Sequence, residues 1–138
     1  MLLDTNIIID VQNEVSPFCQ AAESMIVAAV QETGAAINAV CFAELCAGRP
    51  DASAAIEAEL STLGIQILDV PAAAAPICGR AYSQYRKERR RAGGGNAPAT
   101  PLPDFFIGAH AELLGWKLAT RDSDRYRIYF PAVELIEP

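Results

Sequence analysis

The chain begins MLLDTNIIID, residues 1–10, and this stretch decides the fold. Two leucines precede a carboxylate, Asp4, and three isoleucines follow it closely. We predict that residues 2–6 form a short buried strand, with Asp4 near its carboxyl end. A buried carboxylate is costly unless it is paired, hydrogen-bonded, metal-bound or protonated. The stretch therefore predicts that Asp4 has partners elsewhere in the chain.

Length and composition favour one globular domain over residues 1–138. The chain is 51% hydrophobic and 20% charged, and it has no apolar run near the roughly 18 residues of a membrane span. Its four cysteines form no Cys-x-x-Cys pair and it has a single histidine, His110, so a zinc cluster is not expected. We expect a cytoplasmic protein with reduced, packed cysteines and no membrane association.

Predicted strands and helices alternate along the chain. Further strands are expected at 35–40, 65–68, 117–120 and 133–136. Helices are expected at 16–33, 41–49, 51–64, 69–92 and 104–115. Four of them are expected to start at a polar residue, namely Ser16, Asp51, Asp69 and Asp104. Residues 93–103, rich in Gly and Pro, are expected to form a loop. This alternation predicts an α/β fold with a mostly parallel sheet. Ligand sites of such sheets lie beyond the carboxyl ends of the strands.

Four acids fall at such positions. Asp4 ends the first strand, Glu44 lies on the helix after the second, Asp104 starts the helix before the fourth, and Asp122 follows the fourth. Clustered carboxylates repel one another unless a cation offsets their charge, and all-oxygen ligands suit Mg²⁺ or Mn²⁺. Such a site would hydrolyse a phosphodiester with metal-activated water. Asp124 competes with Asp122 for the fourth place, and we favour Asp122 because it lies nearer the strand end.

Taken singly, these acids have simpler interpretations. Asp104 alone would be a helix cap and Asp122 a turn residue. Asn6 and Thr120 are candidates for orienting the metal ligands by hydrogen bonds, although a capping Asn and a strand Thr explain them about as well. His110 is interpreted as a packed or solvent-edge histidine rather than a general base.

The net charge of −6 is unevenly distributed. Residues 1–79 hold ten acids and one base, which gives −9, and residues 80–138 hold seven acids and ten bases, which gives +3. The run YRKERRR at 85–91 is either a solvated helix end or a phosphate-contacting patch, with Tyr82 and Tyr85 available for stacking. The candidate RNA contacts are Arg86, Lys87, Arg89, Arg90, Arg91 and Arg121.

Four motifs together resemble PIN-domain ribonucleases, in particular VapC-type toxins of toxin–antitoxin pairs. They are LLDTN, the AEL of CFAELCAG, PDFFIGAHA and LATRDSDRYRIYFP, and the resemblance covers essentially the whole chain. It implies a three-layer α/β/α sandwich and Mg²⁺- or Mn²⁺-dependent cleavage of RNA. By this resemblance, the family's four acidic positions correspond to Asp4, Glu44, Asp104 and Asp122. Its polar positions that support the acids correspond to Asn6 and Thr120. The resemblance also implies a homodimer and a VapB-type antitoxin partner.

Three other hypotheses remain at this point. A receiver-like signalling module would use Asp69 as phosphoacceptor, but it leaves Glu44 and Asp104 without a role. A haloacid-dehalogenase-like phosphatase needs Asp-x-Asp after the first strand, where this chain has Asp4-Thr5-Asn6. A PIN-like domain that binds RNA or protein without cutting would not need the acids.

Overall fold

The computed structural model describes residues 1–138 and contains one five-stranded sheet in the order β3-β2-β1-β4-β5. Every neighbouring pair of strands is parallel. The strands are β1 (Leu2–Leu3), β2 (Ala35–Asn38), β3 (Ile65–Leu68), β4 (Leu118–Ala119) and β5 (Leu135–Ile136). The expected α/β class and parallel sheet are confirmed.

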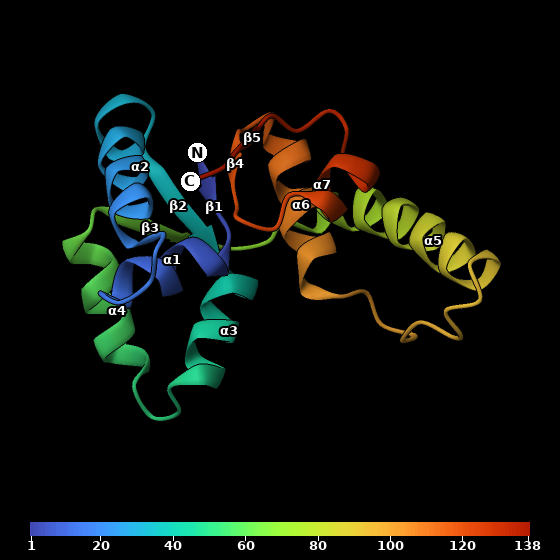
Figure 1. Ribbon diagram of the computed structural model, residues 1–138, viewed down its shortest axis with the longest axis horizontal. Helices are drawn as coiled ribbons and strands as arrows, with labels where there is room; N and C mark the ends of the chain where they lie inside the picture. The colour runs from blue at the N-terminus through green and yellow to red at the C-terminus, as the bar shows by residue number, and fades with distance from the viewer.

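Seven α-helices accompany the sheet. They are α1 (Thr5–Gln12), α2 (Cys19–Glu32), α3 (Ala39–Gly48), α4 (Ser53–Thr62), α5 (Ala75–Arg91), α6 (Pro103–Leu114) and α7 (Asp124–Tyr129), and a 3₁₀ turn, η1 (Ala72–Ala74), precedes α5. Figure 1 shows the sheet between α2 and α4 on one side and α5 and α6 on the other, which is the expected three-layer sandwich. None of these helices combines the length and the apolarity needed to cross a membrane.

The predicted first strand, residues 2–6, is too long. It ends at Leu3, and α1 begins at Thr5 because Asp4 caps the helix: its side chain accepts a hydrogen bond from the Thr5 N–H. The isoleucines beyond the predicted strand belong to this helix, which the sequence pattern did not predict. Ile7 and Ile8 are buried on it, whereas Ile9 is exposed. A short apolar run does not distinguish a strand from a buried helix, and the capping carboxylate decides between them.

Several predicted helix starts are also wrong. The second helix begins at Cys19, because Ser16 forms a turn in which its hydroxyl accepts from the Phe18 N–H. Asp51 has a φ of 66°, outside the helical region, and α4 begins at Ser53. The long helix begins at Ala75 rather than Asp69, after the 3₁₀ turn. Asp104 lies in the first turn of α6 and does not cap it.

The core is apolar on both faces of the sheet. The side chains of β1 and β4 are fully buried, as expected for central parallel strands. At one point α6 approaches the ring of Phe130 so closely that only glycine fits. A Cβ added to Gly108 would overlap the Phe130 ring.

Gly108→Ala should therefore destabilise the protein by about 1–3 kcal/mol, because the added methyl group overpacks the core. The matched control is Gly79→Ala in α5, where a Cβ would meet no atom within 4 Å. That substitution should stabilise by about 0.5–1 kcal/mol through helix propensity. Urea unfolding of both variants measures the difference, and equal effects would contradict the packing described here.

Candidate functional site

Asp4 is the most constrained polar residue of the structure. It is 6% exposed and lies between β1 and α1. Its Oδ1 accepts from the Thr5 N–H at 2.7 Å. Its Oδ2 accepts from Thr120 Oγ1 at 2.7 Å, Asn6 Nδ2 at 3.0 Å and the Tyr126 hydroxyl at 3.2 Å. Four donors thus hold one carboxylate, and Oδ2 has no capacity for a further partner.

The charge of Asp4 is nevertheless costly. Burial raises the pKa of this carboxyl, and the negative charge of Asp122 raises it further, while the hydrogen bonds from Thr120, Thr5 and Tyr126 lower it. The balance is a pKa above the ordinary value. A cation bound beside the free side of Oδ1 would relieve this cost.

Glu44 comes to the same place through α3. Asn38 ends β2 and caps α3, because its Oδ1 accepts from the N–H groups of Val40 and Cys41 at 3.0 and 3.1 Å. This cap starts the helix immediately after the strand, so Glu44 lies little more than one turn from the sheet edge. The Thr5 hydroxyl donates to Glu44 Oε2 at 2.5 Å. Thr5 therefore links the first acid to the second.

The other two acids come from α6 and from the segment after β4. Asp104 lies in the first turn of α6, and Arg125 Nη1 donates to its Oδ2. Asp122 follows β4, and its N–H donates to Thr120 Oγ1 at 3.1 Å. Thr120 thus holds both Asp4 and the backbone of Asp122.

All four acids line one hollow of about 300 Å³. Its walls are Asp4, Thr5, Asn6, Ile9, Glu44, Asp104 and Asp122. Asp124 does not line it and is exposed on α7. The carboxylates face a common space but stand apart. No three His, Cys, Asp or Glu side chains are close enough together to bind one metal ion in this arrangement. Carboxylates repel one another when no cation offsets their charge, which favours such a separation.

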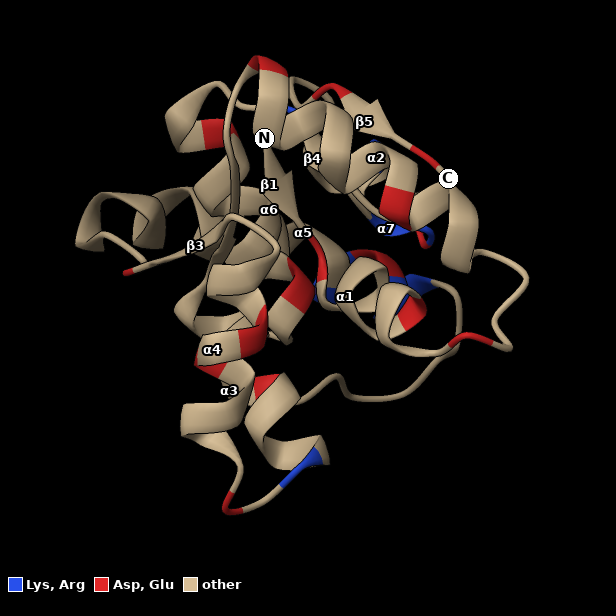
Figure 2. Cartoon of the chain, turned by 90° about the vertical axis from the view of Figure 1, so that its left-hand side faces the viewer, with Lys and Arg blue, Asp and Glu red and all other residues tan.

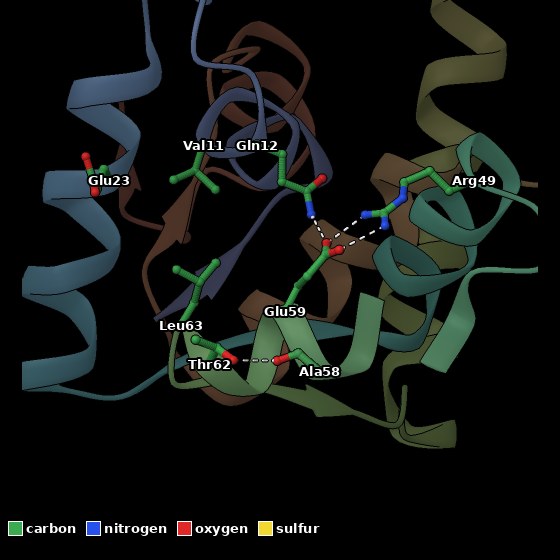
Figure 3. Close-up of a pocket in the computed structure, with 8 residues that line it drawn as sticks. All are labelled: Val11, Gln12, Glu23, Arg49, Ala58, Glu59, Thr62 and Leu63. Carbon is green, nitrogen blue, oxygen red and sulfur yellow. Dashed lines mark hydrogen bonds and ion pairs between the residues drawn. The ribbon is translucent and has the colours of Figure 1, made fainter. Parts of the chain in front are cut away.

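A larger hollow lies elsewhere and offers no comparable chemistry. It has a volume of about 640 Å³ and lies between α1, α2 and α4 (Figure 3). Arg49 and Glu59 pair across it at 2.6 Å, and Gln12 Nε2 donates to Glu59 at 2.9 Å. The hydrogen bond from Arg49 lowers the pKa of Glu59. Arg49 and Glu59 satisfy each other, so we do not assign the functional site to this hollow.

The two tyrosines named as stacking candidates belong to the core. Tyr82 is buried, donates its hydroxyl to the Pro98 carbonyl at 2.7 Å and packs edge-on against Phe105. Tyr85 packs between Tyr82, Phe105 and Tyr129. Tyr82 is therefore not available to stack on a base. His110 is also buried, as expected.

Of the candidate RNA contacts, the basic run lies at the end of α5. Figure 1 shows this end at the tip of a projection, from which residues 92–102 return to α6. Arg86, Lys87, Arg89, Arg90 and Arg91 are all exposed there. Arg121 is engaged within the fold, since it pairs with buried Asp10 at 2.8 Å and its guanidinium lies 5.0 Å from the Phe18 ring centre. Acidic segments dominate the side viewed in Figure 2, which looks onto α1, α3 and α4.

Three residues of the site escaped sequence reasoning. Thr5, Tyr126 and Arg125 contact Glu44, Asp4 and Asp104, respectively. Thr5 had a local signal, since it follows the capping Asp directly. The other two lie on α7, a helix that the sequence pattern did not reveal.

The PIN-domain sequence profile matches residues 1–131, which is nearly the whole chain. The chain belongs to the PIN-domain family. A search of curated protein sequences finds no match.

Solved structures share this fold over almost their full length. A chain of VapBC2 from Rickettsia felis, bound to a DNA fragment from its promoter, matches with a TM-score of 0.68 and 20% identity, covering 99% of this chain and 97% of that one. A chain of DNA-bound VapBC from Salmonella typhimurium matches with a TM-score of 0.66 and 21% identity, covering 99% of this chain and 96% of that one. A chain of FitAcB from Neisseria gonorrhoeae matches with a TM-score of 0.64 and 21% identity, covering 98% of this chain and 95% of that one. At these identities the likeness shows the PIN fold.

The raised pKa of Asp4 predicts a pH-dependent stability in the metal-free PIN domain. The folded state binds the Asp4 proton more tightly than the unfolded state does, so the charge costs stability above the raised pKa. The cost disappears as the pH falls through that pKa. The free energy of unfolding of the wild type, minus that of Asp4→Asn, should therefore increase as the pH falls from neutrality toward the ordinary aspartate pKa of about 3.9. Urea unfolding in EDTA measures it, and a constant or falling difference would contradict the burial argument.

Proposed function

We propose that this PIN domain is a metal-dependent endoribonuclease and the toxin of a toxin–antitoxin pair. One observation carries the proposal: four carboxylates from separate parts of the chain line a single hollow at the carboxyl ends of β1 and β4. Capping of α1 explains why Asp4 is present, but it does not explain why three further acids line the same hollow. Such a concentration of negative charge suits a site that binds divalent cations.

The donor set fits Mg²⁺ or Mn²⁺. Every polar side chain on the wall of the hollow offers oxygen, apart from the amide nitrogen of Asn6, which already donates to Asp4 and Thr120. Asp4 would bind through Oδ1, because Oδ2 already has three donors. Glu44, Asp104 and Asp122 would complete the protein ligands. A bound cation supplies an activated water and stabilises the negative charge that develops on the phosphate.

The chain's own residues would position these ligands. Asn6 and Thr120 fix Oδ2 of Asp4, which leaves Oδ1 as the oxygen for the cation, and Thr5 fixes one oxygen of Glu44. The other oxygen of Glu44 accepts no hydrogen bond and stays available to the cation. Preorganised ligands of this kind lower the cost of assembling the metal site.

The substrate proposal rests on charge and on family. A phosphodiester is the group for which a cation-filled acidic site is suited, and we infer RNA as the polymer. The basic run at the end of α5 would hold its backbone, in a way that depends on salt but not on sequence. Lys87 and the arginines around it are exposed, as this requires.

The partner proposal comes from the structural neighbours, which are toxin–antitoxin complexes such as those from Salmonella typhimurium and Klebsiella pneumoniae. We propose that this chain also binds a small VapB-type antitoxin, which keeps it silent in the cytoplasm, and that it acts as a homodimer. Membership of the PIN family argues against the receiver and phosphatase hypotheses. Consistent with this, Asp69 lies outside the acidic hollow. A PIN domain that binds RNA without cutting it remains the second candidate.

Purified protein should cut cellular RNA into discrete fragments with Mn²⁺ and leave it intact with EDTA, because the acids need a cation to activate water. Gel analysis of total RNA measures this, with Asp4→Asn as the control for a contaminating nuclease. Intact RNA with a folded, metal-bound wild type would favour the non-cutting alternative.

Asp122→Asn and Asp124→Asn form a matched pair of neighbouring substitutions. Asp122 lines the hollow and Asp124 does not. Asp122→Asn should lower cleavage by more than about 100-fold, since groups that merely support metal ligands are already worth about 10–100-fold. Asp124→Asn should change it by no more than about twofold, as an exposed surface substitution does. Initial rates on a defined RNA measure both, and a reversed order would assign the fourth acid to Asp124.

A further inference from the structure

Arg125 lies at the acidic hollow without being part of the ligand set. Its Nη1 donates to Asp104 Oδ2, and both side chains are about one-third exposed (35% and 28%). The next residue, Tyr126, donates its hydroxyl to Asp4 at 3.2 Å. Two consecutive residues of α7 thus contact two different acids of the hollow. The Tyr126 contact anchors this helix, so Arg125 remains within a side chain's length of the site whichever partner it has.

The other arginines of this region have partners outside the hollow. Arg121 pairs with Asp10 at 2.8 Å, and Arg127 pairs with Glu137 at 2.9 Å. Arg125 differs from both, because its ion-pair partner is one of the four acids.

The charges of the site require such a group. Four carboxylates and no Lys, Arg or His line the hollow. One divalent cation offsets two of their four charges, and an incoming RNA phosphate adds a negative charge. An arginine at the rim would favour the phosphate, because its planar guanidinium donates two parallel hydrogen bonds to phosphate oxygens.

The same guanidinium competes with a metal for Asp104. Its positive charge, paired with Oδ2, offsets the negative charge of the carboxylate that would bind a cation. The hollow holds no ready-made group of three acidic ligands, which agrees with an Asp104 that is engaged by Arg125.

We propose that Arg125 is a phosphate-binding residue of the RNA site, held on Asp104 in the metal-free protein and released when a divalent cation takes that carboxylate. This inference rests on the proposed metal-dependent ribonuclease function. It makes the contribution of Arg125 to RNA binding depend on metal binding, because the arginine is free for the phosphate only once the cation has replaced it.

The first test is Mn²⁺ affinity, measured by isothermal titration without RNA. Arg125→Gln removes the competitor, so it should bind Mn²⁺ about fivefold more tightly than the wild type, roughly what a partly exposed ion pair is worth. Arg127→Gln is the control, because it removes the same charge from the same helix while its partner Glu137 lies outside the hollow. It should shift the affinity by less than about twofold. In an Asp104→Asn background, Arg125→Gln should have no effect on Mn²⁺ affinity.

The second test is RNA affinity, measured by fluorescence anisotropy in a Glu44→Gln background to suppress cleavage. With saturating Mn²⁺, Arg125→Gln should weaken binding and reduce the slope of log K against log salt by about 0.7, the value for one phosphate contact on a single strand. Without Mn²⁺ it should leave both quantities unchanged, and Arg127→Gln should leave them unchanged in either condition.

The outcomes separate the two proposals. A wild type that binds no Mn²⁺ overturns the metal-dependent function and this inference with it. A wild type that binds Mn²⁺, with Arg125→Gln no tighter than Arg127→Gln, overturns this inference alone. So does an effect of Arg125→Gln on RNA affinity that is the same with and without Mn²⁺.

Discussion

The architecture of this PIN domain depends on the buried carboxylate of Asp4. That single side chain ends β1, caps α1, and receives donors from the end of β4 and from α7. Residues more than a hundred positions apart in the chain are thereby fixed around one group, since Thr120 and Tyr126 both donate to Oδ2. A fully hydrogen-bonded carboxylate is tolerated in a core, but its charge still costs free energy there. The fold therefore positions a charged group whose burial still costs free energy, and the proposed cation would relieve that cost.

The sheet topology explains why the other acids lie nearby. The chain builds β1, β2 and β3 outward in one direction, then returns to place β4 and β5 on the other side of β1. The strand order reverses between β1 and β4, and ligand sites of open parallel sheets form at such points. Glu44 follows β2 and Asp122 follows β4, so both lie beside Asp4 at the carboxyl edge. Asp104 joins them from the start of α6.

The sequence predicted the sheet and the four acids because both depend on local patterns. Alternating strands and helices require a parallel sheet, and its carboxyl ends bring strand-end acids to one edge. The element boundaries were less predictable, since the isoleucines after Asp4 suit either a strand or a helix and the capping bond to Thr5 decides. Helix α7, with the sequence DRYRIY, is too short for a helical period of apolar residues to be recognised. The contacts of Tyr126 and Arg125 were therefore beyond sequence reasoning, because they depend on where tertiary packing places that helix.

Whether the acidic hollow is a divalent-metal site is best decided by a crystal structure of the protein soaked in Mn²⁺, with the ion located by anomalous scattering. We expect a manganese ion in the hollow, with Asp4 Oδ1 and at least one oxygen of Glu44, Asp104 or Asp122 within about 2.2 Å, close to the distances of hard-cation sites. An empty hollow at saturating Mn²⁺, or an ion bound only elsewhere, would contradict it.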